Sequence, residues 1–124
     1  MRSFALTMRI GDDPAQVRAA VLGLAAVSRV QMASHDFPLL YESGIRYQRE
    51  PAGRENWQTA AETLARGFAD CEDLAAYRLA ELHRQGEEQA TIDVKQVNPD
   101  LMHIRVRRAD GTLEDPSRIL GMGT

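Results

Sequence analysis

The residues of this sequence that are best suited to covalent chemistry are a cysteine, a histidine and an aspartate, Cys71, His103 and Asp115. Cys71 is the single cysteine of the chain and stands within the run Gly-Phe-Ala-Asp-Cys-Glu-Asp-Leu-Ala (67–75). A thiol acts as a nucleophile when a base takes its proton and an acid orients that base. The order of the three residues therefore predicts nucleophilic catalysis through a thiol.

The elements expected around these residues would bring them together. A central helix predicted over 71–84 places Cys71 in its first turn, where free backbone N–H groups stabilise a thiolate and can form part of an oxyanion hole. His103 falls in a strand, and Asp115 follows the next strand along the chain. Because neighbouring antiparallel strands lie side by side, we expect His103 and Asp115 to meet near the sulfur.

The whole pattern predicts an α+β fold, in which helices are followed by a small antiparallel sheet. A turn at Asp110-Gly111 is expected to join the last two strands. The expected elements are, in order, a strand over 4–10, a helix over 15–33, a mostly irregular stretch over 35–54, a short helix over 57–66 ended by Gly67, the central helix, and strands over 90–97, 102–107 and 112–114.

Three carboxylates next to the cysteine affect its ionisation. Asp70 and Asp73 fit a capping box, as the N-cap and the third residue of the central helix. Together with Glu72, they also bring negative charge that raises the pKa of the thiol. Either a cationic His103 outweighs this charge, or the carboxylates point away, or a cation neutralises them; calcium would suit an all-oxygen site.

Each candidate residue also has an ordinary structural interpretation. A lone cysteine on the apolar face of a helix is usually buried in the core, and His103 is compatible with the surface of a strand. Trp57 is expected to anchor the core, although its indole N–H suits an oxyanion hole. Asp110, the competing candidate for the acid, is interpreted as a turn residue. A zinc site at Cys71 and the three histidines lacks the usual ligand spacing.

Composition limits the classes of function. The chain has 124 residues, of which 44% are hydrophobic and 27% charged, and a formal net charge of -3. We therefore expect one domain over 1–124 and no nucleic-acid partner. The longest apolar stretch is too short for a membrane span, no signal peptide is recognised, and a single cysteine fits a reducing compartment. A cytoplasmic protein without a membrane partner is expected.

Three segments, 67–75, 102–106 and 112–116, resemble the signature blocks of the transglutaminase-like branch of papain-type cysteine enzymes. The run Asp-Cys-Glu-Asp-Leu-Ala is particularly similar to the bacterial transglutaminase-like cysteine proteinases. The resemblance implies a minimal catalytic-type core over 56–124, preceded by an N-terminal strand, helix and loop over 1–55. Family members often have an aromatic residue soon after the histidine, whereas Ile104 and Arg105 stand here.

The resemblance also implies roles for particular residues. It makes Cys71 the nucleophile, His103 the base and Asp115 the orienting acid, and it makes Asp70 and Glu72 candidates for calcium. The expected function is that of a small cysteine enzyme that transfers an acyl group from a protein substrate, as a protease or a transamidase. No cofactor other than calcium is expected. The oxyanion hole would come from the Cys71 N–H and the side chain of Trp57 or Gln58.

A second resemblance favours a different function. The segments 40–47 and 114–122 are similar to short proteins encoded among tailed-phage structural genes. This implies a non-catalytic structural or assembly protein of a phage particle, with the triad idle. Its partners would be phage structural proteins, and it would be incorporated into a virion as part of a larger oligomeric assembly.

Overall fold

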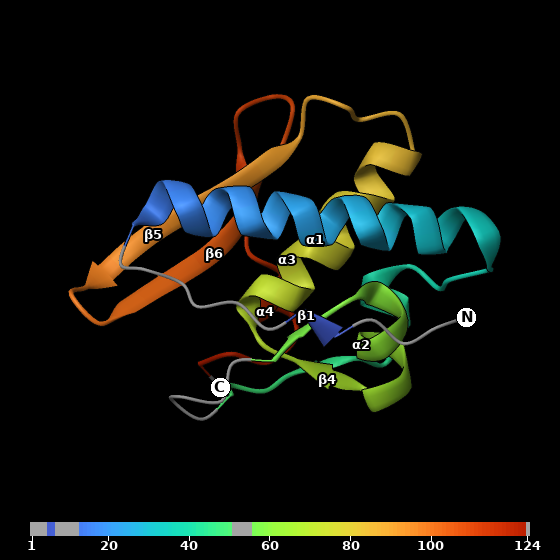
Figure 1. The fold of residues 1–124 in the computed structure, drawn as a ribbon, viewed down its shortest axis with the longest axis horizontal. Coiled ribbons are helices and arrows are strands. Elements are labelled where there is room, and N and C mark those ends of the chain that lie inside the picture. The colour runs from blue at the N-terminus through green and yellow to red at the C-terminus, as the bar shows by residue number, and fades with distance from the viewer. Residues whose placement is uncertain (1–4, 7–12, 51–55, 124) are drawn as a thin grey trace.

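The computed structural model describes residues 5–6, 13–50 and 56–123 (Figure 1). The helices are α1 (Pro14–Ser34), α2 (Ala60–Arg66), α3 (Cys71–Arg84) and α4 (Pro116–Ile119), with a 3-10 helix η1 (Leu40–Glu42). The strands are β1 (Ala5–Leu6), β2 (Arg46–Tyr47), β3 (Trp57–Gln58), β4 (Phe68–Ala69), β5 (Thr91–Asn98), β6 (Leu101–Arg107) and β7 (Leu113–Glu114). The protein is thus an α+β structure, as the sequence predicts at this coarse level.

The largest sheet is antiparallel, with the strand order β5-β6-β7. Its register pairs Lys95 with His103 and Val106 with Glu114. The predicted turn between β6 and β7 is confirmed: Gly111 has a φ of 91°, and the Arg108 N–H donates to the Thr112 carbonyl at 2.8 Å. A positive φ is readily adopted by glycine, which explains the Asp-Gly sequence at this position.

Two long helices cover one face of this sheet. Figure 1 shows α1 lying across α3 and the β5–β6 hairpin, and α1 contacts both α3 and β5. The core between the helices and the sheet contains buried aliphatic residues of α1, α3, β5 and β6, including Val21, Leu79, Ile92 and Val106. Burial of each such side chain contributes about 1.5–3 kcal/mol, so this core fixes the helix that carries Cys71 against the strand that carries His103.

The short helix predicted over 57–66 was wrong at its N-terminal end. Trp57 and Gln58 form β3, which pairs antiparallel with β1, and α2 begins at Ala60. Thr59 is the N-cap of α2 and forms a capping box with Glu62, so the helix cannot extend further back. Its predicted end is confirmed, because Gly67 is the C-cap with a φ of 81°.

The stretch predicted to be mostly irregular, 35–54, contains η1 and β2, and β2 pairs in parallel with β4. Of the predicted first strand, Ala5 and Leu6 lie in β1. Residues 4, 7–10 and 51–54 of these two predictions lie outside the described residues. Among the helices of the described chain, none has the length and apolar character that crossing a membrane requires.

Candidate functional site

Cys71 is the first residue of α3, because Asp70 caps the helix immediately before it. The Asp70 carboxylate accepts the Cys71 N–H at 2.6 Å, and the Asp73 carboxylate accepts the Asp70 N–H at 3.3 Å. The predicted capping box is therefore confirmed. Since Asp70 already takes the Cys71 N–H, this N–H is not available to an oxyanion in the state described here.

The thiol of Cys71 is buried against a carboxylate. The residue is 7% exposed, and its Sγ donates to Glu72 Oε2 at 3.4 Å. Burial is the main cause that raises the pKa of the thiol well above its ordinary value, and the charges of Glu72 and Asp70 raise it further. The backbone N–H of Ile104 in β6 donates to the sulfur and acts in the opposite direction, but it does not outweigh them. Cys71 is therefore a neutral thiol in this state.

His103 and Asp115 are brought together by the hairpin. The imidazole Nε2 lies 2.8 Å from Asp115 Oδ2, and the two side chains are 16% and 20% exposed. Asp115 is also the N-cap of α4, where its Oδ1 accepts the Arg118 N–H at 3.3 Å. Among the described residues, no hydrogen bond is made to the Nδ1 of His103. When Nε2 carries the proton that Asp115 accepts, Nδ1 is left with a free lone pair.

The three residues line one cavity of about 620 Å³. Such a volume is within the range of ligand-binding pockets. No hydrogen bond joins Cys71 to His103 among the described contacts, and the thiol is bonded to Glu72. Acidic residues (Glu50, Asp70 and Glu72) and basic residues (Lys95, Arg105 and Arg118) both contribute to the lining.

The two candidates for the oxyanion hole lie in different surroundings. Trp57 is 2% exposed and lines the cavity, and its buried Nε1 has no hydrogen-bond partner within the described part of the chain. Gln58 does not line the cavity. Its amide donates to the Phe68 carbonyl at 3.1 Å and accepts from Arg66 at 2.7 Å, so it holds the turn between α2 and β4. Of the two, only Trp57 is among the residues that line the cavity.

The carboxylates around Cys71 have no basic partner. None of Asp70, Glu72 and Asp73 forms an ion pair with another described residue. Burial raises the pKa of Glu72 well above its ordinary value, and the negative charges of Asp73 and Asp70 add to this. Burial likewise raises the pKa of Asp73 to about 8. Burial and neighbouring negative charge therefore disfavour the ionised forms of Glu72 and Asp73.

The same cluster was the candidate for calcium. Ligand atoms of Asp70, Cys71 and Glu72 lie within 4.8 Å of one another. However, both oxygens of Asp70 are already hydrogen-bonded, to the N–H groups of Cys71 and Glu50, and Glu72 accepts from the thiol. Calcium requires six to eight oxygen ligands, and a thiol is not among its usual ligands. The described residues are therefore a poor match for calcium, which stays a sequence-based expectation.

Tyr47 also belongs to this site, although it was not among the residues expected there. Tyr47 lines the cavity, and its pKa is raised to about 12, mainly by burial and also by the charge of Asp70. It reaches this position because β2 pairs with β4 in a register that sets Tyr47 beside Ala69. A parallel pairing between two-residue strands has no local signal in the sequence, so no motif could have indicated it.

Comparisons with protein-family models, with curated proteins and with solved structures find no match to this chain. The support for a function therefore comes from the geometry of the cavity and from the chemistry of the residues that line it.

Proposed function

We propose that this protein is a small cysteine enzyme that transfers the acyl group of a protein amide to Cys71, like the transglutaminase-like enzymes that its sequence resembles. The observation that supports this most strongly is the contact of 2.8 Å between His103 Nε2 and Asp115 Oδ2, on the wall of the cavity that Cys71 also lines. A histidine fixed in this way by a carboxylate is the base that a thiol nucleophile requires.

In the proposed reaction, His103 Nδ1 takes the proton of the Cys71 thiol, and the sulfur attacks the carbonyl carbon of the substrate. Asp115 keeps the proton on Nε2 and stabilises the imidazolium that forms. The C–N bond then breaks, the imidazolium protonates the leaving amine, and a thioester to Cys71 remains. Water would release the acyl group as an acid, and a second amine would release it as a new amide.

The thiol of Cys71 must first give up the hydrogen bond that it donates to Glu72 in the resting state. The proposed reaction therefore includes a change of hydrogen-bond partner for the thiol, from Glu72 Oε2 to His103 Nδ1. The buried, unpartnered indole N–H of Trp57 is the donor that we assign to the oxyanion formed on the substrate carbonyl.

One observation favours the second candidate, a non-catalytic structural or assembly protein of a phage particle. The thiol is 7% exposed, and both burial and the carboxylate neighbours keep it protonated. A buried, neutral cysteine is what a core position without chemical function contains. In this alternative, the contact between His103 and Asp115 joins β6 to the start of α4 and has no further role.

The reactivity of Cys71 distinguishes the two functions. We would measure its alkylation by iodoacetamide as a function of pH in the wild type and in His103→Ala. The matched control is His83→Ala, because His83 lies at the other end of α3, bonds the Ala90 carbonyl at 2.8 Å and is outside the lining of the cavity. The pKa of a free thiol is about 8.5, so alkylation at about pH 6 requires an activated thiol.

If the protein is an enzyme, we expect Cys71 to be alkylated at about pH 6, and we expect this reactivity to be lost in His103→Ala and retained in His83→Ala. A thiol that reacts only after denaturation, and equally in all three proteins, would contradict catalysis and support the assembly role. That role would then be tested by looking for stoichiometric incorporation of the protein into a larger particle.

A further inference from the structure

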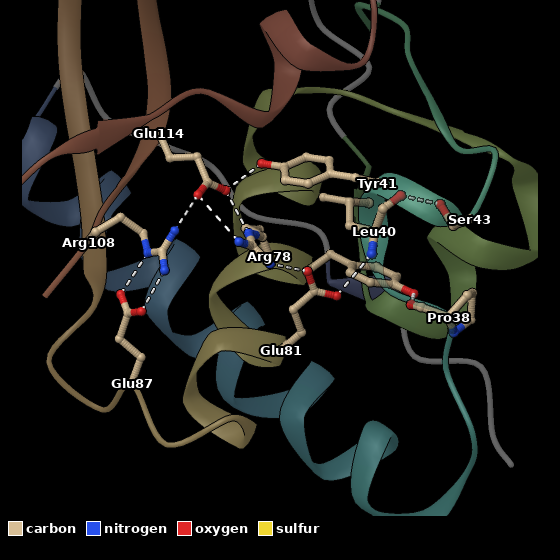
Figure 2. Close-up of polar contacts among 10 residues, drawn as sticks. Pro38, Leu40, Tyr41, Ser43, Arg78, Glu81, Glu87, Arg108 and Glu114 are labelled. Atoms are coloured by element: carbon tan, nitrogen blue, oxygen red, sulfur yellow. Dashed lines mark hydrogen bonds and ion pairs between the residues drawn. The ribbon is translucent and has the colours of Figure 1, made fainter.

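Glu114, which directly precedes Asp115, is the centre of a group of polar contacts (Figure 2). Its carboxylate accepts from Arg78 Nε at 2.6 Å and from Arg108 Nη1 at 2.8 Å, and it also accepts from the hydroxyl of Tyr41. The side chains of Glu114 and Arg78 are only 15% and 14% exposed. Such charge-assisted hydrogen bonds are stronger than neutral ones and are weakly screened in a buried position.

Arg78 connects Glu114 to a second carboxylate and, through it, to the first residue of η1. Its Nη1 donates to Glu81 Oε2 at 2.7 Å, and Glu81 Oε1 accepts the Leu40 N–H at 3.0 Å. The guanidinium of Arg78 also lies over the ring of Tyr41, at 5.0 Å from its centroid. The donor atoms of Arg78, Arg108 and Tyr41 that Figure 2 joins to carboxylates with dashed lines are thus all paired. This pairing favours one fixed arrangement of the group.

The segment around Asp115 is restrained on both sides: α4, which follows it, contacts α3, β2 and β6, whereas β7, which precedes it, is short. Strand β7 has two residues, which pair with Val106 and Arg107 of β6. Asp115 comes immediately after this short ladder, and α4, which it caps, has only four residues. A ladder of this length fixes the direction of the following side chain weakly, so an anchor at Glu114, the residue next to Asp115, adds to the restraint that α4 provides.

The anchor runs to the helix that carries Cys71. Arg78 lies in α3, about two helical turns after Cys71, so the ion pair between Arg78 and Glu114 joins the segment of Asp115 to the nucleophile's own helix. Burial alone would raise the pKa of Glu114, but the hydrogen bonds from Arg78 and Tyr41 outweigh it and hold this pKa below its ordinary value. Glu114 is thus ionised and keeps both arginines bound at neutral pH.

We propose that Glu114 is a positioning residue, which holds Asp115 in contact with His103 by anchoring β7 to α3 through Arg78. The catalytic meaning of this role rests on the proposed function, whereas the contact between His103 and Asp115 is a feature of the fold. The proposal is therefore tested first on the contact itself and then on the reactivity of Cys71.

The primary measurement is the rate at which the His103 Nε2 proton exchanges with water, followed by NMR in protein labelled at histidine nitrogen. The resonance is assigned by its absence in His103→Ala. Glu114→Gln removes the charge at nearly unchanged size, and we expect it to raise the exchange rate roughly tenfold, which corresponds to a loss of about 1.4 kcal/mol. Alkylation of Cys71 is expected to fall by a similar factor.

Glu81→Gln is the matched control. Glu81 is 5% exposed and binds the same arginine, but it joins α3 to Leu40 and not to β7. Glu81→Gln should lower the melting temperature about as much as Glu114→Gln does. Because Arg78 keeps its direct bond to Glu114 in this variant, the exchange rate of the His103 proton should stay within a factor of about two of the wild type. Equal exchange in the wild type and in folded Glu114→Gln would overturn the proposal. So would an equal rise in both variants, because it would reflect general loosening of the structure.

Tyr41→Phe provides the test if Glu114→Gln does not fold. It leaves both ion pairs of Glu114 in place and removes one hydrogen bond, so we expect exchange of the Nε2 proton to rise about threefold. An unchanged rate in Tyr41→Phe would then reject the positioning role. The exchange measurement does not depend on catalysis. If wild-type Cys71 proves inert, the proposed function fails, while the role of Glu114 is still decided by the His103 proton.

Discussion

Replacement of Asp115 by asparagine tests the pairing at the centre of the proposed site. The substitution keeps the size of the side chain and removes its charge. Asparagine is as good an N-cap as aspartate, so the hydrogen bond to the Arg118 N–H that begins α4 can be retained. What is lost is the negative partner of the imidazolium that would form, in the proposed reaction, when His103 takes the proton of Cys71.

The size of the effect follows from the geometry of the pair. His103 Nε2 and Asp115 Oδ2 are 2.8 Å apart, with side chains 16% and 20% exposed, so the contact is short and largely shielded from water. A hydrogen bond to a charged group contributes about 1.5–3 kcal/mol. Since 1.36 kcal/mol corresponds to a factor of ten, Asp115→Asn should lower the population of the thiolate–imidazolium pair by roughly 10- to 100-fold.

The assay is alkylation of Cys71 by iodoacetamide, followed by mass spectrometry over a range of pH, with thermal melting to confirm the fold. Asp110→Asn is the matched control, because Asp110 is the other candidate acid and bonds only Thr112 in the β6–β7 turn. We expect Asp115→Asn to lose the alkylation of Cys71 at about pH 6, and Asp110→Asn to keep it. Alkylation of folded Asp115→Asn within about twofold of the wild type would refute the assignment of Asp115.

Two further predictions concern the carboxylates beside the thiol. Glu72→Gln removes the negative charge beside the Cys71 thiol, although its amide oxygen can still accept from the sulfur, so the pKa of the thiol should fall, visible as a shift of the alkylation profile to lower pH; an unchanged profile would mean that the charge of Glu72 does not contribute to this pKa. Burial raises the pKa of Asp73 from its ordinary 3.8 to about 8, so folded protein holds a proton that unfolded protein releases. Stability should therefore fall as the pH rises from about 4 to about 8, and urea unfolding of Asp73→Asn should show a weaker dependence. The same slope in the variant would exclude Asp73 as its source.

The parts of the fold that local chemistry determines could be predicted from the sequence. The helix α1 begins at Pro14 behind the Asp13 cap, and α3 begins at Cys71 behind the Asp70 capping box. The hairpin of β6 and β7 follows from alternation and from the Asp-Gly turn. Because that hairpin fixes which residues stand side by side, the contact between His103 and Asp115 could also be expected before the structure was known.

The rest depends on contacts between segments that are distant in the sequence. Strand β3 exists because Trp57 and Gln58 pair with β1, although the Thr-x-x-Glu signature at 59–62 does indicate where α2 begins. The group around Glu114 combines Tyr41, Arg78 and Arg108, which no spacing rule connects. Nor could the sequence give the direction of the Glu72 side chain, which turns toward the thiol and so determines the resting state of Cys71.

Glu72 need not exclude catalysis, because its effect on Cys71 changes sign with its own protonation. The ionised carboxylate opposes a thiolate, as do burial and Asp70, and the N-terminus of α3 offsets this by only about 0.3–1 kcal/mol. Protonated Glu72 carries no charge, and its hydroxyl can donate to the thiolate. Since the pKa of Glu72 is raised well above its ordinary value, the protonated form persists toward neutral pH. An active Cys71 should therefore lose reactivity as Glu72 ionises, before the free-thiol reaction takes over at high pH. An idle core cysteine would only gain reactivity with rising pH, so the shape of the profile separates the two functions.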